Sequence, residues 1–202
     1  DLGQQREAAA LGMWVFIAQE VLFFGGLFAA YTVYRNQYPA AFAAGSHHLS
    51  WKIGFANTLV LIGSSLTMAL AVYSAAVGKK IRVVGFILAT ILLGSVFLGV
   101  KYFEYGDKIR PCLGDGPYTG CLLPGERFDA AALHLEGAEG GHAQIYFSLY
   151  FGMTGLHALH MIIGMPIILG IAFLAGRGRY SPEYHSPVEI VGLYWHFVDI
   201  IW

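Results

Sequence analysis

Residues 13–31 read MWVFIAQEVLFFGGLFAAY, an apolar run that contains a single acid, Glu20. A helix that crosses a membrane needs about 20 mostly apolar residues, so this run predicts a transmembrane helix. A carboxylate in hydrocarbon is costly and persists only where it has a partner, a cavity or a function. Glu20 is therefore the first candidate functional residue.

The rest of the chain has the same character. Of its 202 residues, 56% are hydrophobic and only 12% are charged, and the mean hydropathy is +0.57. Soluble domains average about 25% charged residues. We predict an all-α polytopic membrane protein, a single bundle of five transmembrane helices over residues 8–34, 53–77, 81–103, 142–175 and 187–202. The last of these is short, and we expect it to continue past Trp202.

Charge limits the partners and sets the expected orientation. The net charge of −1 does not indicate a nucleic-acid partner. Lys and Arg are dense in the short connections 78–82 and 176–186, and such loops are typically cytoplasmic. We therefore expect the N-terminus on the cytoplasmic side, or on the matrix side in a mitochondrion, and the loop over residues 106–141 on the opposite side. Of these two locations we favour the bacterial inner membrane, with that loop in the periplasm.

Both cysteines, Cys112 and Cys121, lie in that long loop. A pair of cysteines in a loop that faces an oxidising compartment predicts a disulfide. The alternative is a pair of free thiols. A docking surface for an outer partner is one hypothesis for this loop, and a disulfide-tied surface loop is the other.

Few ionisable residues are expected inside the membrane. Glu20 and Asp199 each lie about 18 Å along their helices and His196 about 14 Å along its helix, at 1.5 Å per residue. His196 and Asp199 are three residues apart and so share a helix face, and we predict that they form a buried pair. Glu20 should be neutral or hydrogen-bonded among Leu22, Phe23 and Phe24.

Two histidines and one more acid complete this set. His157 and His160 show the same three-residue spacing in "TGLHALHMIIG" (154–164). Two histidines so placed can reach one metal ion, but neither the His-Glu-x-x-His nor the Glu-x-x-His pattern of helical metal sites lies within any of the predicted helices. We expect no metal, cofactor or catalytic site, and histidines that bond neighbouring helices. Glu104 should be solvated near the outer end of its helix.

Glycine pairs indicate where helices could approach closely. Gly25 with Gly26, and Gly152 with Gly155, are the candidates in this sequence.

Several long segments resemble one known family, subunit III of the haem-copper oxidases, the third core subunit of cytochrome c oxidase. The segments "TGLHALHMIIG" (154–164) and "YWHFVDIIW" (194–202) are similar to its two signature stretches. The similar segments also include "FIAQEVLFFGGLFAAY" (16–31), "NTLVLIGSSLTMALA" (57–71) and "VKYFEYGDK" (100–108). Glu20 falls on the family's membrane-embedded glutamate. The resemblance covers all five predicted helices in order.

This resemblance implies a non-catalytic subunit. In the family, haem and copper are held by the catalytic subunits, and subunit III packs beside subunit I, in a complex that also holds subunit II and that pumps protons. It binds phospholipid and supports stable oxygen reduction and proton uptake. The expected associated groups are therefore phospholipids, subunits I and II, and other respiratory complexes. Longer members have seven helices, and their lipid cleft lies between the first two helices and the other five. The present chain matches only the last five, so the cleft should be absent here or completed by another subunit.

Other functions stay open from the sequence. The same fold could serve a quinol oxidase or a nitric oxide reductase-associated protein, because the electron donor is decided in other chains. A metal-dependent membrane enzyme with its own His/Glu site, and a transporter with substrate passing near Glu20, are the remaining alternatives.

Overall fold

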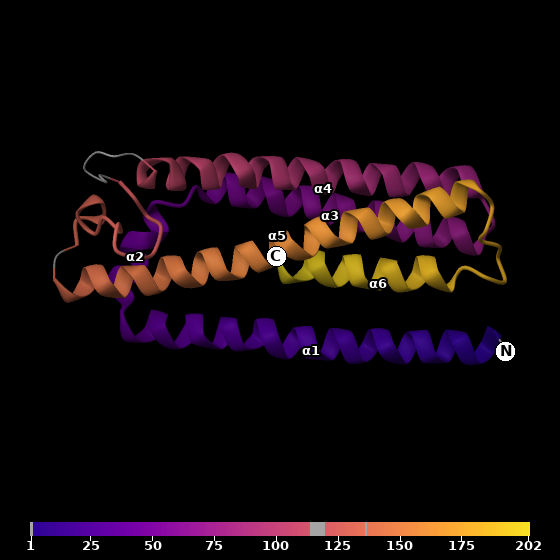
Figure 1. Ribbon diagram of the computed structural model, residues 1–202, viewed down its shortest axis with the longest axis horizontal. Coiled ribbons are helices and arrows are strands. Elements are labelled where there is room, and N and C mark those ends of the chain that lie inside the picture. The colour runs from indigo at the N-terminus through magenta and orange to yellow at the C-terminus, as the bar shows by residue number, and fades with distance from the viewer. Residues whose placement is uncertain (1, 114–119, 136) are drawn as a thin grey trace. The chain divides into compact units, whose positions relative to one another are not determined.

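The computed structural model describes residues 2–113, 120–135 and 137–202, and within these ranges it is helical without any strand (Figure 1). The helices are α1 (Leu2–Gln37), α2 (Pro39–His47), α3 (Trp51–Ala76), α4 (Lys80–Ile109), α5 (Ala138–Gly176) and α6 (Ser186–Ile201). Two short 3₁₀ turns, η1 (Arg110–Cys112) and η2 (Ala131–Leu133), lie between α4 and α5. The predicted all-α class is confirmed for the described residues.

Four of these helices are long and apolar enough to cross a membrane. They span Gly3–Gln37, Trp51–Ala76, Lys80–Cys112 and Ala138–Gly176. The fifth predicted span corresponds to α6, which has 16 residues and so falls short of the roughly 20 residues that a spanning helix needs. Pro187 lies in the first turn of α6, where its missing N–H is not required.

Helix α2 lies in a connection for which no helix was predicted. It has nine residues and begins with Pro39, and it buries Ala41, Phe42 and Gly45. The Phe42 ring meets the Tyr146 ring edge-on at 5.2 Å. A nine-residue helix is marginal by itself, so this packing against α5 accounts for α2 better than its own sequence does.

Two helices end in the same way, at a glycine with positive φ. Gly78 (φ 75°) follows α3, and Gly178 (φ 74°) follows α5. After α3, the Lys79 N–H donates to the Ser74 carbonyl, and after α5 the Arg179 N–H donates to the Leu174 carbonyl. These are the bonds of a Schellman cap, which favours glycine because a side chain is strained at positive φ. The caps turn the chain sharply into the two short basic connections.

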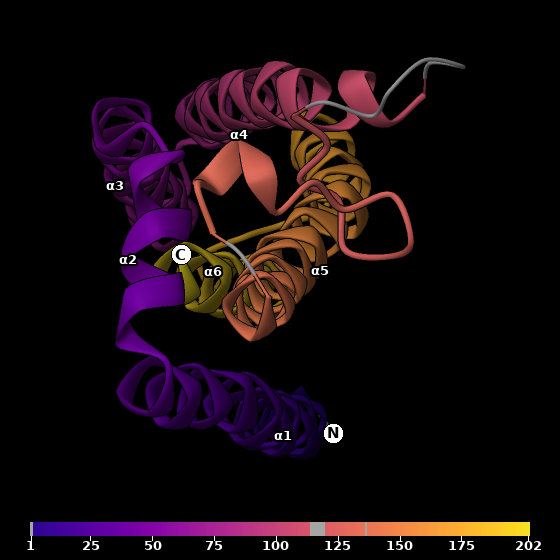
Figure 2. The same ribbon diagram turned by 90° about the vertical axis from the view of Figure 1, so that its left-hand side faces the viewer.

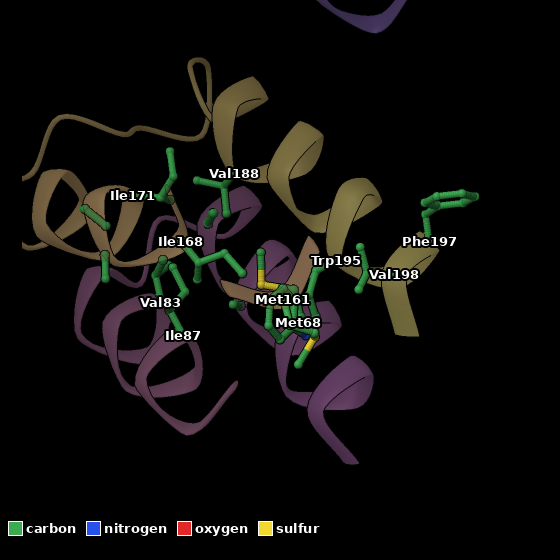
Figure 3. Close-up of a cluster of buried hydrophobic side chains, with 14 of the residues drawn as sticks. Met68, Val83, Ile87, Met161, Ile168, Ile171, Val188, Trp195, Phe197 and Val198 are labelled. Carbon is green, nitrogen blue, oxygen red and sulfur yellow. The ribbon is translucent and has the colours of Figure 1, made fainter. Parts of the chain in front are cut away.

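The chain divides into two compact units. Unit 1 holds the residues up to Leu22 together with Phe55–Leu98 and His157–Trp202, and unit 2 holds the described residues of Phe23–Gly54 and Gly99–Leu156. The core of unit 1 includes the fully buried Met68, Met161 and Trp195, which meet between the helices in Figure 3. The core of unit 2 is built around Tyr146 and Phe147.

Within unit 1, α6 packs between α3 and the C-terminal half of α5 (Figures 1 and 2). Small residues permit this. A Cβ on Gly192 of α6 would lie 2.8 Å from Val72 Cγ2, and a Cβ on Gly164 of α5 would lie 2.8 Å from Tyr194 Cε1. The predicted glycine pairs were wrong for the described residues, because a Cβ on any of the four would meet no described atom within 4 Å apart from its own stretch of helix. Close approach depends on which face of a helix the glycine occupies, and spacing alone does not decide that.

Candidate functional site

Glu20 is buried against a histidine of another helix. Its side chain on α1 is 9% exposed, and its Oε2 lies 3.3 Å from Nε2 of His160 on α5. The Tyr194 hydroxyl of α6 donates to the His160 carbonyl at 2.9 Å. Leu22, predicted to shield the carboxyl, is instead 77% exposed. The partner of Glu20 is therefore an imidazole, and α1, α5 and α6 meet at this point.

A pocket lies beside this pair. Its volume is about 390 Å³, and its walls are almost entirely apolar. It is lined by Met13, Phe16, His160, Ile163, Ile167, Ile190, Val191 and Tyr194. Apolar walls with one imidazole at the edge suit a hydrocarbon chain better than a polar metabolite.

His196 and Asp199 do not form the predicted pair. Nδ1 of His196 lies 2.6 Å from the Ser65 hydroxyl of α3. Neither buried carboxyl oxygen of Asp199 has a hydrogen-bond partner among the described residues. Neighbouring Ser64 accepts a hydrogen bond from Trp195 Nε1 at 2.8 Å. Ser65 was not identifiable from the sequence, because no acid or base lies near it along the chain.

His157 lies in an aromatic environment. It is 2% exposed, and its ring lies 5.2 Å from that of Phe97 and 5.1 Å from that of Trp202. In the described part of the chain, no three His, Cys, Asp or Glu side chains are grouped so that they could hold a metal ion. His157 and His160 thus have different surroundings in spite of their regular spacing.

Glu104 is paired rather than solvated. Its carboxylate accepts hydrogen bonds from Lys101 at 2.8 Å, from Lys108 at 3.2 Å and from the Tyr150 hydroxyl at 2.6 Å. The side chains of Lys101 and Lys108 are 8% and 9% exposed. The expectation of interfacial water was wrong here, because two lysines at i−3 and i+4 and a tyrosine of α5 occupy its place. The positions of Lys101 and Lys108 relative to Glu104 were visible in the sequence. Tyr150 was not identifiable, because it lies on a different helix.

The long loop of unit 2 is closed by a disulfide. Cys112 and Cys121 are joined with an S–S distance of 2.11 Å. Arg127 donates to the Cys112 carbonyl at 3.0 Å, and the Gly120 N–H donates to Asp129 at 2.7 Å. Much of the sequence between the cysteines, residues 114–119, lies outside the described residues.

Long apolar helices with polar side chains bonded between them define a polytopic α-helical membrane protein. A family model described as cytochrome c oxidase subunit III matches residues 4–135 and 138–202. The chain belongs to this family, and it is an integral membrane protein.

Its relatives share this description. It is 33% identical over 196 residues to cytochrome c oxidase subunit 3 of Thermostichus vulcanus, covering 95% of this chain and 81% of the relative. It is 29% identical to the subunit 3 of Corynebacterium diphtheriae (96% and 82% covered) and 29% identical to that of Loxodonta africana (98% and 67% covered). Family membership implies a multi-subunit oxidase.

Proposed function

We propose that this chain is the non-catalytic subunit III of a respiratory haem-copper oxidase of the cytochrome c oxidase type. The observation that carries the proposal is the family match over residues 4–135 and 138–202. Catalytic subunit I and subunit II supply haem and copper, and this chain packs beside subunit I and supports stable oxygen reduction and proton uptake. The alternative is that this chain is subunit III of a quinol oxidase or a protein associated with a nitric oxide reductase.

We also propose that α6 completes a fifth membrane span and that the protein lies in a bacterial inner membrane with its N-terminus in the cytoplasm. The Ser65–His196 contact supports this, because it ties α6 to the middle of α3. The disulfide supports a periplasmic loop over residues 106–141, since disulfides persist in oxidising compartments.

The first experiment isolates the complex through a tag on this chain after gentle solubilisation. A reduced-minus-oxidised spectrum should show oxidase-type haem, and large hydrophobic subunits should co-purify. The haem type also helps to separate the cytochrome c and quinol alternatives. A chain that purifies alone, free of haem, would overturn the proposal.

Phospholipid binding is the second element of the proposed function. The apolar pocket beside Glu20 and His160 is the supporting feature, because it is large enough for part of an acyl chain. Its lining includes Ile163, which is 52% exposed, whereas adjacent Ile162 is 54% exposed and does not line it.

This neighbouring pair provides a matched test. Ile163→Trp should fill the pocket and reduce the phospholipid retained by the purified complex, and Ile162→Trp should leave it unchanged. The measurement is lipid per complex by native mass spectrometry. Equal retention in both variants would show that the acyl chain does not use this pocket.

A further inference from the structure

A second pocket lies between α3 and α6 in unit 1, and it combines polar groups with an apolar rim. Its volume is about 300 Å³. The lining residues are Ile62, Ser65, Leu66, Ala69, His196, Asp199 and Ile200. It shares no residue with the pocket beside Glu20.

The polar part of this pocket lacks a partner for its acid. Both carboxyl oxygens of Asp199 are buried, and no group in the described ranges hydrogen-bonds to them. A buried polar group without a hydrogen-bond partner destabilises the protein, and the cost is larger if the group is charged. The Ser65 hydroxyl is engaged with Nδ1 of His196, so these two neighbours do not satisfy the carboxyl. Both carboxyl oxygens of Asp199 are therefore open to a hydrogen-bond partner from outside the described chain.

The depth of the pocket limits where that partner comes from. Ser65 lies on the membrane-crossing candidate Trp51–Ala76, about 21 Å from its first residue and about 17 Å from its last. The hydrocarbon core is about 30 Å thick, so a group at this position lies near its middle. Lipid headgroups do not reach that depth, and acyl chains carry no donor.

The rim of the pocket is exposed and apolar. Ile62 is 60% exposed, Leu66 is 62% exposed and Ile200 is 82% exposed. Helices in membranes associate through close packing and through hydrogen bonds from Ser, Thr, Asn, Gln or His side chains. An apolar rim around an unsatisfied acid matches a helix that presents one such donor.

We infer that the α3/α6 pocket seats a transmembrane helix of a partner subunit, which donates a hydrogen bond to Asp199. This inference rests on the proposed function to the extent that it requires a membrane partner. Beyond the proposed function, the inference identifies the surface that binds the partner, and it specifies that the partner helix carries a hydrogen-bond donor.

The test uses the complex isolated through a tag on this chain. Leu66→Trp should obstruct the rim, and Asp199→Leu should remove the acceptor. Leu92→Trp on α4 is the matched control, because Leu92 is 65% exposed and does not line the pocket. We expect the first two variants to weaken retention of the haem-bearing subunit by roughly three- to thirtyfold over a detergent titration, while Leu92→Trp retains it. Asp199→Asn, which keeps an acceptor oxygen, should remain close to wild type.

A second measurement separates docking from a structural role. Thermal unfolding of the separated chain should be unchanged or improved by Asp199→Leu, because that substitution removes an unsatisfied carboxyl. A photo-reactive residue at position 66 should cross-link to a membrane segment of an oxidase subunit, and one at position 92 should not cross-link to that segment. Wild-type retention in both Leu66→Trp and Asp199→Leu, or a cross-link to lipid alone, would overturn the inference. If the wild-type chain retains no haem-bearing subunit, the proposed function itself fails.

Discussion

Among individual residues, several buried polar side chains of this protein contact polar groups of another helix. Glu20 reaches His160, His196 reaches Ser65, and Glu104 reaches Tyr150 as well as two lysines of its own helix. Each inter-helix contact joins residues more than 40 positions apart. In hydrocarbon such contacts replace those that water would otherwise provide.

The Glu20–His160 contact leads to a prediction about charge. Glu20→Gln keeps the size and polarity of the side chain, so we expect a stability loss below about 1 kcal/mol if the pair is neutral. Assembly should stay intact and oxygen reduction should change little. The measurements are thermal unfolding of the purified complex and its oxygen consumption.

A different result would be informative. Loss of the complex on Glu20→Gln, or a cost of about 3–5 kcal/mol, would mean that the pair is ionised, since removing one member of a buried ion pair is strongly destabilising.

At the scale of elements, close helix contacts depend on glycines that face a neighbour. Gly192 on α6 lies against Val72 of α3. Valine is stiff at χ1 and has no flexible end that could move aside. The contact therefore requires a residue without a side chain.

Gly192→Ala should destabilise the protein by about 1–3 kcal/mol through overpacking. Gly152→Ala on α5 is the control, because an added Cβ there meets nothing within 4 Å. In a helix interior that change should be neutral or stabilising by up to about 1 kcal/mol. Thermal unfolding in detergent should show a lowered midpoint for Gly192→Ala and an unchanged or raised midpoint for Gly152→Ala, and equal shifts would argue against this packing.

At the scale of the whole molecule, each unit has its own means of stabilisation. Unit 1 has a large apolar core with α6 inserted among its helices, and unit 2 has aromatic packing and a disulfide-closed loop. The disulfide closes a loop with a sequence separation of 9, which in the chain-entropy model stabilises by about 2.6 kcal/mol.

Replacing both cysteines, Cys112→Ser with Cys121→Ser, should therefore loosen the loop. Amide hydrogen exchange should accelerate in residues 120–135, and peptides of α6 should exchange as before. Retention of partner subunits tests the docking hypothesis for this loop. Lost retention would support docking, and unchanged retention would leave the loop a tied surface segment.

Much of the fold could be predicted because its signal is local. The runs that became α1, α3, α4 and α5 are long and apolar, and a membrane helix satisfies its backbone hydrogen bonds within itself. Helix α2 was missed because its nine residues depend on packing against Tyr146. The glycine pairs failed because spacing does not reveal which face of a helix meets another.

The membrane class and the apolar helices follow from the amino-acid sequence, and the resemblance of its motifs indicates the family. The sequence also identified Glu20, His157, His160, His196, Asp199 and Glu104 as the polar residues to explain. Their partners depend on how the helices pack, which brings Glu20 to His160 and His196 to Ser65 and leaves Asp199 without a hydrogen-bond partner among the described residues. The physical reason is that each residue turns a helix by about 100°. Partners are therefore set by how separate helices rotate and pack, which local sequence does not encode.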